Sequence, residues 1–214
     1  MIDRGTPLLL ACLNGHLAVA KYLTEERQCE AACIDNSGNT PVHEACRDGH
    51  LGIAKYLVEE QHCNPACGDN HGWKPLRLAC QNGHLNIAKF LIEEQQCDPA
   101  SKKNDGWTPL HSACLNGHLA VAKYLIEEKQ CTSACKDDSG WTPLHVACQN
   151  GRLDMARYLI EEQHSNPACS NNNGWKPLHL ACQNGHLNVA KFLIEEQQCD
   201  SACRLDTTAF SMVS

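Results

Sequence analysis

The chain has 214 residues, of which 43% are hydrophobic and 20% are charged, a composition typical of a folded globular protein. Its formal net charge of −7 disfavours a nucleic-acid binder, because that function needs a basic face to displace counterions from phosphates. Only a short apolar run precedes Asn14 and Gly15, so the N-terminal sequence predicts neither a signal peptide nor a membrane span. We therefore expect a cytoplasmic protein without a nucleic-acid or membrane partner, and delivery into a host cell remains compatible with this sequence.

The sequence repeats itself with a period of 34 residues. Five glycines mark the period, at Gly38, Gly72, Gly106, Gly140 and Gly174. Such self-similarity is the signature of a repeat architecture. We predict a single array over residues 1–203, followed by a divergent C-terminal tail at 204–214. The predicted repeats span approximately residues 4–37, 38–71, 72–105, 106–139, 140–173 and 174–203.

Each copy predicts two short helices, as the fourth copy illustrates. Thr108 suits an N-cap, and Pro109 suits the first helical position because its missing N–H would have no partner there anyway. Gly117 is expected to end this helix in a left-handed conformation. A second apolar stripe follows from Leu119 to Ile126, and the turn-forming residues after it indicate a loop. One such helix pair cannot bury its apolar face, so stacked neighbours are expected to bury it.

The stretch Gly-Trp-Thr-Pro-Leu-His-x-Ala-Cys-x-Asn-Gly-His-Leu-x-x-Ala-Lys-Tyr-Leu, at 106–125, resembles the ankyrin repeat. The resemblance covers almost the whole chain and implies an all-α fold, a solenoid of six helix-turn-helix repeats joined by β-hairpin-like loops. The usual ankyrin unit is one residue shorter, and the extra residue here lies at the end of the second helix. At the helix exit the glycine of the family is replaced by Gln or His, so the exit geometry is expected to differ. The replaced positions are Gln28, His62, Gln96, Gln130, His164 and Gln198.

A longer period lies above the first one. Residues 72–98 and 174–200 are almost identical, and other matching stretches are also 102 residues apart, which is three repeats. We infer that a block of three repeats was duplicated, and we expect a surface that presents similar features twice. This long, cysteine-rich repeat is similar to ankyrin arrays of sponges, other invertebrates and their symbionts. An effector of a symbiont that mimics host ankyrin proteins is therefore an alternative function.

Sixteen cysteines recur at three positions of the repeat, which by resemblance to the ankyrin pattern are small buried positions. We expect them to act as small core residues. Equivalent residues on stacked helices lie about 8–10 Å apart, too far for a ladder of disulfides. His111 and Cys114 form a His-x-x-Cys pattern, but only the Cys is expected to face the core, which disfavours zinc. We predict no metal or cofactor, and a thiol- or metal-responsive module remains a second alternative.

Two further patterns recur and are interpreted as architecture. The histidine after the helix-ending glycine occurs in five copies, whereas a catalytic histidine should be unique and should face a nucleophile or a base. We therefore predict no enzyme activity and no catalytic residue. Pairs of glutamates end each second helix and follow a Lys or Arg by four residues, which predicts an acidic ridge exposed to solvent.

The variable positions remain for recognition. The resemblance implies a recognition face made of the hairpin tips and the first helices, on the concave side, that binds another protein without catalysis. Tryptophan is enriched at binding hot spots, but an indole that packs over its hairpin also stiffens the stack, and both interpretations stay open. The predicted partner-binding residues are Asn70, His71, Trp73, Arg77, Asn104, Asp105, Trp107, Ser112, Asp138, Ser139, Trp141, Asn172, Asn173 and Trp175.

The two ends of the array lack the polar capping that a stable solenoid needs. The first repeat carries Leu8, Leu9 and Leu10 where polar residues are expected. Three explanations stay open: the tail folds back through Phe210 and Met212, the chain is a slice of a longer array, or the terminal repeats self-associate.

Overall fold

A computed structural model describes residues 6–200, and within that range every regular element is helical. The chain divides into two compact units, residues 1–101 and 102–214, close to the boundary between the third and fourth predicted repeats. We call them unit 1 and unit 2. Phe210 and Met212, on which one explanation of the tail depends, lie outside the described residues.

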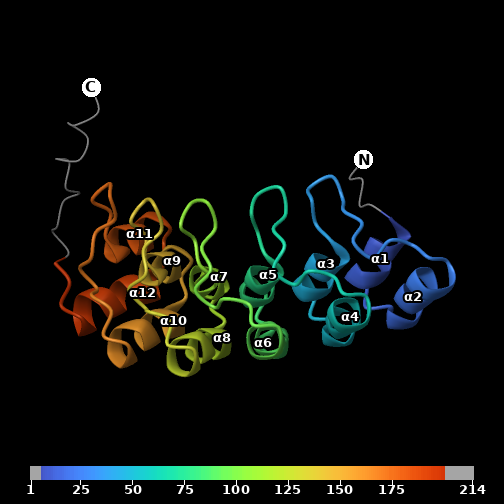
Figure 1. The fold of residues 1–214 in the computed structure, drawn as a ribbon. Helices are drawn as coiled ribbons and strands as arrows, with labels where there is room; N and C mark the ends of the chain where they lie inside the picture. Colours follow the sequence, from blue (N-terminus) through green and yellow to red (C-terminus); the bar gives the residue numbers. More distant parts are fainter. Residues whose placement is uncertain (1–5, 201–214) are drawn as a thin grey trace. The chain divides into compact units, whose positions relative to one another are not determined.

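Unit 1 contains three helix pairs stacked in order (Figure 1). The first helices pack on one another in the order α1, α3, α5, and the second helices in the order α2, α4, α6. Each second helix continues directly into a π-helical turn. The bounds are α1 (Pro7–Leu13), α2 (Leu17–Lys21), η1 (Tyr22–Glu26), α3 (Pro41–Arg47), α4 (Leu51–Lys55), η2 (Tyr56–Glu60), α5 (Pro75–Gln81), α6 (Leu85–Lys89) and η3 (Phe90–Glu94).

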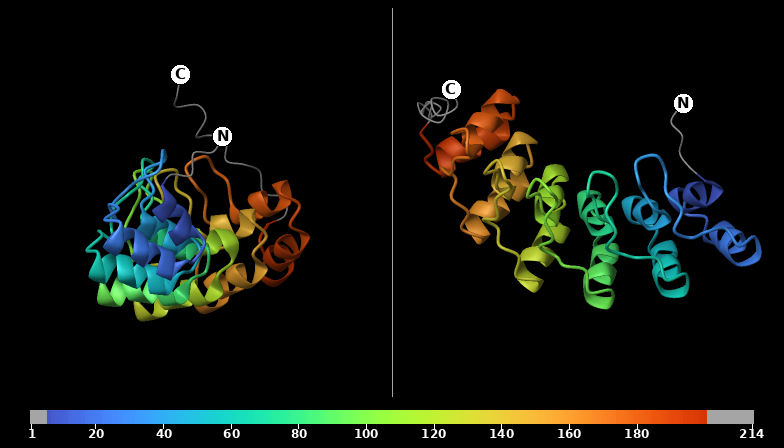
Figure 2. Two further views of the ribbon diagram at one scale, coloured as in Figure 1. Left: turned by 90° about the vertical axis from the view of Figure 1, so that its right-hand side faces the viewer. Right: turned by 45° about the horizontal axis from the view of Figure 1, so that its top comes forward.

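Unit 2 repeats this arrangement, with α9 packed between α7 and α11 and with α12 on α10. In each unit the loops between repeats project from the side of the first helices (Figure 2). The expected all-helical repeat fold is confirmed. The bounds are α7 (Pro109–Asn116), α8 (Leu119–Lys123), η4 (Tyr124–Glu128), α9 (Pro143–Gln149), α10 (Leu153–Arg157), η5 (Tyr158–Glu162), α11 (Pro177–Gln183), α12 (Leu187–Lys191) and η6 (Phe192–Glu196).

Local chemistry explains where the first helices begin. In α7 the hydroxyl of Thr108 accepts a hydrogen bond from the backbone N–H of His111, and Nδ1 of His111 accepts one from the N–H of Thr108. This reciprocal pair is a capping box, which gives partners to two backbone N–H groups at the helix start. Lys74 replaces the threonine at α5 and makes no capping hydrogen bond through its side chain.

The extra residue of the 34-residue repeat is absorbed inside the second helix. The N–H of Gln61 donates to the carbonyl of Tyr56 five residues earlier, and the N–H of Gln95 donates to Phe90 in the same way. A π-turn accommodates one residue more than an α-turn, so the insertion widens the helix without changing where the chain leaves it.

The exit itself keeps the left-handed conformation that a glycine adopts most easily. Gln96 has φ +55° and Gln130 has φ +56°, and all six exit residues lie between +53° and +56°. After the exit, the N–H of Cys97 donates to the carbonyl of Leu91 at 2.9 Å, the wide loop of a Schellman motif. The residues that replace the family's glycine therefore have a left-handed backbone conformation at every exit.

Only some of the cysteines are buried in the core. At the Ala-Cys step, Cys12, Cys46, Cys80, Cys114 and Cys148 are fully buried, and burial raises the pKa of the Cys12 thiol to about 12. Cys182, at the same step of the last repeat, is exposed, as is Cys29 in the first repeat. All fifteen cysteines within residues 6–200 are free thiols. The expectation of a core role fails for Cys29 and Cys182, whose faces no described repeat covers, and it holds only in part for the half-buried Cys67, Cys131, Cys135 and Cys169 of internal repeats.

Candidate functional site

Four of the five described hairpin tips are tight turns held by the side chain of their first residue, and in the tip before α7 Asp105 accepts from the N–H of Trp107 instead. In the tip before α5, the carboxylate of Asp69 accepts hydrogen bonds from the backbone N–H groups of His71 and Trp73, at 2.9 and 2.8 Å. The N–H of Asp69 in turn donates to the carbonyl oxygen of Trp73. Asp137 and Asn171 hold their tips in unit 2 in the same way. The tips are therefore preformed, although no strand is assigned among the described residues.

The predicted tip residues divide into two kinds. Asn70 and Asn172 face the preceding tip, where the amide of Asn70 donates to the Asn36 carbonyl and the amide of Asn172 donates to the Asp138 carbonyl. The backbone N–H of Asp138 likewise donates to the Asp105 carbonyl at 2.9 Å. These residues join successive tips. The other predicted tip residues, His71, Asn104, Asp105, Ser139 and Asn173, are exposed, as are Asn70, Asp138 and Asn172.

The four tryptophans are half-buried and lie over the start of the helix that follows them. The rings of Trp107 and Trp141 lie 5.1 and 5.9 Å from His111 and His145, and Trp175 meets His179 edge-on at 6.2 Å. These contacts support the stiffening interpretation, and the exposed part of each ring leaves the binding interpretation open.

Two predicted site residues are buried. Ser112 is fully buried, and its hydroxyl accepts a hydrogen bond from Nε1 of Trp107 at 2.9 Å. Arg77 is 7% exposed, and its guanidinium stacks on the ring of Trp73 with its central carbon 3.0 Å from the ring centroid. The expectation that both residues face a partner directly is corrected: each supports a tryptophan from beneath.

Unit 1 carries a groove along its tips and first helices. One cleft, of about 430 Å³, is lined by α1, the first described tip and α3, and a second, of about 440 Å³, is lined by that tip, α3, the next tip and α5. The two clefts share Ser37, Asn39, Arg47 and Asp48, so they are adjacent along three repeats, and together we call them the unit 1 groove.

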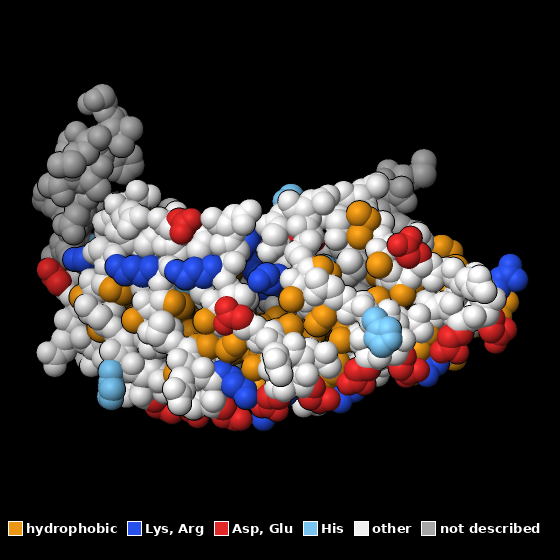
Figure 3. Space-filling view, in the orientation of Figure 1, with side chains coloured by type: hydrophobic (Ala, Val, Ile, Leu, Met, Phe, Trp, Pro, Cys, Tyr) orange, Lys and Arg blue, Asp and Glu red, His pale blue; other side chains and the backbone are white. Residues whose placement is uncertain are grey.

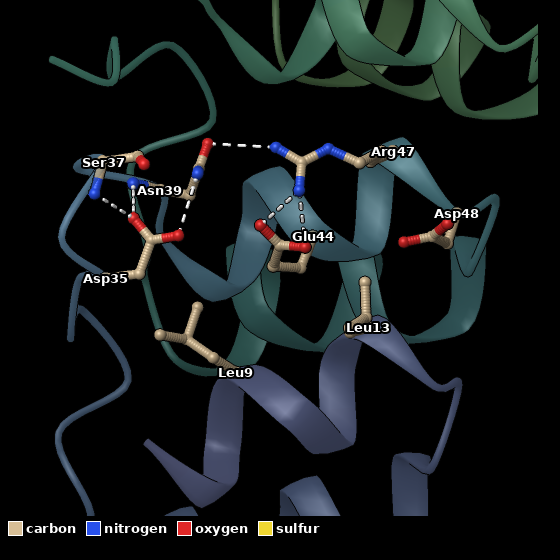
Figure 4. A pocket seen from close by; sticks show the side chains of 8 residues that line it. All are labelled: Leu9, Leu13, Asp35, Ser37, Asn39, Glu44, Arg47 and Asp48. Carbon is tan, nitrogen blue, oxygen red and sulfur yellow. Dashed lines mark hydrogen bonds and ion pairs between the residues drawn. The ribbon is translucent and has the colours of Figure 1, made fainter. Parts of the chain in front are cut away.

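A linked cluster of charged and polar side chains forms the centre of this groove (Figure 4). The guanidinium of Arg47 donates to both carboxylate oxygens of Glu44, at 2.6 and 2.7 Å, and to the side-chain oxygen of Asn39. Asn39 then donates to Asp35 at 2.9 Å. The carboxylate of Asp48 is exposed and lies apart from the cluster (Figure 4).

Electrostatics make this groove acidic. Its lining has four carboxylates, on Asp35, Glu44, Asp48 and Asp69, against the single guanidinium of Arg47. Hydrogen bonds from Asn39 and from backbone N–H groups lower the pKa of Asp35 despite its partial burial, so that carboxylate is charged at neutral pH. Burial raises the pKa of Glu44, and the Arg47 guanidinium opposes that rise.

The repeat register, the capped first helices and the tip geometry agree with the result of a family comparison. Ankyrin repeats, in three matched copies, cover residues 2–66, 61–137 and 129–204. The chain belongs to the ankyrin-repeat family. A search of curated proteins gave no match. Ankyrin repeats are protein–protein interaction modules and, as a family, non-catalytic scaffolds.

The buried histidines of these ankyrin repeats are structural. Nε2 of His145 donates to the carbonyl of Trp175 in the next repeat at 3.0 Å, while its Nδ1 accepts from the N–H of Thr142. Burial lowers the pKa of His145 to about 4, and it lowers the pKa of His43 and His111 as well. A neutral ring with both nitrogens occupied joins neighbouring repeats.

The thiols near these rings are not activated. Sγ of Cys169 lies 3.8 Å from Nδ1 of His145 and 3.9 Å from the hydroxyl of Thr142. Burial nevertheless raises the pKa of Cys169, which opposes formation of the reactive thiolate. Over residues 6–200, no group of three or more His, Cys, Asp or Glu side chains is arranged to hold a metal ion, and no helix is long and apolar enough to cross a membrane.

The ridge at the ends of the second helices is acidic (Figure 3), and glutamates in it form ion pairs with cations of the preceding repeat. Lys21 and Lys55 reach the glutamates Glu60 and Glu94 of the following repeats, at 3.5 and 3.0 Å, rather than the glutamates four residues ahead. Arg157 does make an ion pair with the glutamate four residues ahead, Glu161, at 3.3 Å. The ridge is therefore an interlocked ladder of charges that joins repeats.

The predicted recognition face includes the first-helix positions of Glu44 and Arg47, but the predicted partner-binding residues include none of Asp35, Asn39, Glu44 and Arg47. One signal was present: Glu44 is the only acid at its position of the repeat, where the other copies have Leu, Ser or Val. A carboxylate at a position buried in every internal repeat requires a cation nearby, and Arg47 lies three residues later on the same helix.

Proposed function

We propose that this ankyrin-repeat chain is a non-catalytic scaffold that binds a partner protein through its hairpin tips and first helices. We further propose that the unit 1 groove takes a segment of that partner carrying Lys or Arg side chains. The observation that carries the proposal is the pair of adjacent clefts, lined by the tips and first helices of three repeats and containing four carboxylates against one guanidinium.

The position of the groove supports a peptide-like occupant. It runs along the side of preformed tips, which lose little conformational entropy when a partner binds. Its walls mix the apolar side chains of Leu9, Leu13 and Leu78 with polar groups, as a specific site requires.

Charge selects the chemistry of that occupant. Arg47 already uses its guanidinium on Glu44 and Asn39, whereas Asp48 is an exposed lining residue of both clefts. A lysine or arginine of the partner would find in Asp48 an accessible carboxylate, and the surrounding negative charge would also speed its approach.

The duplication supplies a matched control. Residues 102 positions later are Trp141 for Asn39, Val146 for Glu44, Gln149 for Arg47 and Asn150 for Asp48. A variant of unit 1 with Glu44→Val, Arg47→Gln and Asp48→Asn therefore carries side chains that the same scaffold already holds elsewhere.

Display of random peptides tests the proposal directly. Peptides selected on the wild-type chain and depleted on the triple variant should be enriched in Lys and Arg, and Asp48→Asn alone should weaken them about tenfold, as expected for a charged hydrogen bond. Enrichment without basic residues, or equal binding to the triple variant, would reject the groove as the site.

The tryptophan tips of unit 2 are tested separately. We expect Trp107→Ala together with Trp141→Ala to reduce capture of the full partner from the native source while the helical circular-dichroism signal is retained. Unchanged capture would remove those tips from the binding face.

A further inference from the structure

The first helix pair exposes apolar side chains that internal repeats bury. Tyr22 is 48% exposed and Val19 is 47% exposed, whereas Tyr56 and Ile53, one repeat later, are each 2% exposed. The residue type hardly changes between the two repeats. The face of α1 and α2 is therefore shaped to receive a preceding repeat.

The last helix pair shows the complementary exposure. Cys182 is exposed although Cys148, one repeat earlier, is completely buried, and Leu187 is 63% exposed. A Cβ built on Gly185 would meet nothing within 4 Å, whereas one on Gly151 would lie 2.6 Å from the ring of His186 in the next repeat. The face of α11 and α12 is shaped to receive a following repeat.

Successive repeats meet through one set of polar contacts, used in both units. Nε2 of His50 donates to the Leu13 carbonyl at 3.0 Å in unit 1, and Nε2 of His186 donates to the Gln149 carbonyl at 2.8 Å in unit 2. In both pairs the histidine lies 37 residues after the residue whose carbonyl accepts.

The ridge supplies a second set of contacts in the same register. Lys21 lies 4.7 Å from the ring centroid of Tyr56 and pairs with Glu60, while the Tyr56 hydroxyl donates to Glu25 at 3.0 Å. In unit 2, Lys123, Tyr158, Glu162 and Glu127 make the same three contacts.

We propose that the face of α11 and α12 in one copy of the chain packs on the face of α1 and α2 in a second copy, head to tail, in the register used by successive repeats. The register places Lys191 of one copy on the Tyr22 ring and beside Glu26 of the next, and brings Glu195 to the Tyr22 hydroxyl. His16 fills the space beside Gly185. A second copy fits because both halves of every contact are present on one chain, with opposite charges at the two ends.

Charge reversal tests this register. Wild-type chain followed by sedimentation from micromolar to near-millimolar concentration should rise past the mass of a dimer, because a head-to-tail contact leaves a free face on each end. Lys191→Glu and Glu26→Lys should each weaken association about tenfold or more by placing like charges together. An equimolar mixture of the two variants should recover association, because every junction between one variant and the other pairs opposite charges.

The mixture separates a specific junction from poor folding, because a misfolded variant would not be rescued by another variant. Lys136→Glu, an equal change of charge on an exposed loop residue, serves as the control and should leave association unchanged. Under reducing conditions, alkylation of Cys182 should slow with rising protein concentration, while that of the half-buried Cys135 should not.

A mass of one chain at every concentration would overturn the proposal, as would association that survives both reversals or that the mixture fails to restore. Concentration-independent reactivity of Cys182 would also overturn it, and a different occupant of the two faces would then have to be sought.

Discussion

Units 1 and 2 have similar sequences at an offset of 102 residues, yet they differ at residues of the unit 1 groove. Contacts that join repeats recur in both units: Lys21 with Glu60 corresponds to Lys123 with Glu162. The groove residues do not persist, since the ion pair of Glu44 and Arg47 corresponds to Val146 and Gln149.

The difference separates two kinds of position in one scaffold. The ridge residues Lys21 and Glu60 contact each other across two repeats, and unit 2 keeps the same pair as Lys123 and Glu162. Residues along the groove contact only their own tip and helix, so they can change without unstacking the repeats. The third residue of each first helix also differs between the units, although a histidine there contacts the next repeat. Unit 1 has Leu9, His43 and Arg77, where unit 2 has histidine in all three repeats.

Lowering the pH should destabilise unit 2 more than unit 1, and we expect this to be the largest difference between them. Burial lowers the pKa of His145 to about 4 from its ordinary value of 6.5, so the unfolded chain binds the proton first. The contribution of His145 to the free energy of unfolding is therefore fully present above pH 6.5 and is lost as the pH falls toward 4. This contribution is on the order of 3 kcal/mol. Unit 2 adds the lowered pKa of His111, whereas unit 1 has only His43 of this kind.

Urea unfolding between pH 7 and pH 4.5 measures this effect. In a Trp73→Phe variant all tryptophan emission comes from unit 2, so its midpoint can be followed alone. His111→Leu introduces the residue that unit 1 carries at the matching Leu9, and should lower stability at pH 7 while making unit 2 less sensitive to acid. A midpoint that does not move with pH would contradict the role of the buried rings.

Arg47→Gln should have the second largest effect. It leaves the Glu44 carboxylate, at a residue only 6% exposed, without its guanidinium, at a cost of about 2 kcal/mol. Adding Glu44→Val restores the pair found in unit 2 and should recover most of that stability. Urea midpoints of the wild type, both single variants and the double variant form a thermodynamic cycle. Additive changes would show that the ion pair is not coupled.

Sequence reasoning predicted what the repeat register determines. Thr108, Pro109 and Gly117 mark the start and end of α7, and the structure has the helix between them. The period of 34 also predicts which faces stack, because each copy must bury the same stripe.

Sequence reasoning did not predict what depends on neighbours or on the path of a loop. Tyr22 and Tyr56 occupy the same repeat position with the same side chain, and only the second has a described repeat before it. Ser112 is buried because Trp107 folds back over it, which the variable position alone does not reveal. The π-turn is equally hidden, since an i to i+5 bond preserves the apolar pattern that also predicts an α-helix.

Restoring the missing cap should sharpen the comparison further. Lys176→Thr in unit 2 is expected to stabilise by about 1 kcal/mol, because His179 already accepts from the Lys176 N–H and the threonine hydroxyl would complete the box. Lys74→Thr in unit 1 should gain only about half as much, because Arg77 cannot accept at that place. Urea midpoints give both values, and equal gains would show that the histidine contributes nothing to capping.

The smallest effect should be the same in both units. Gln28 and Gln130 are 102 residues apart, with φ values of +53° and +56°, so Gln28→Gly and Gln130→Gly each relieve the same left-handed strain. The cost of that conformation, about 1 kcal/mol, is partly offset by the greater freedom of glycine in the unfolded chain, which leaves a gain of about 0.5 kcal/mol each. Thermal or urea unfolding of the two variants measures it. Unequal gains would mean that the duplicated helix exits are not equivalent, and that the two units differ in their backbone as well as in their grooves.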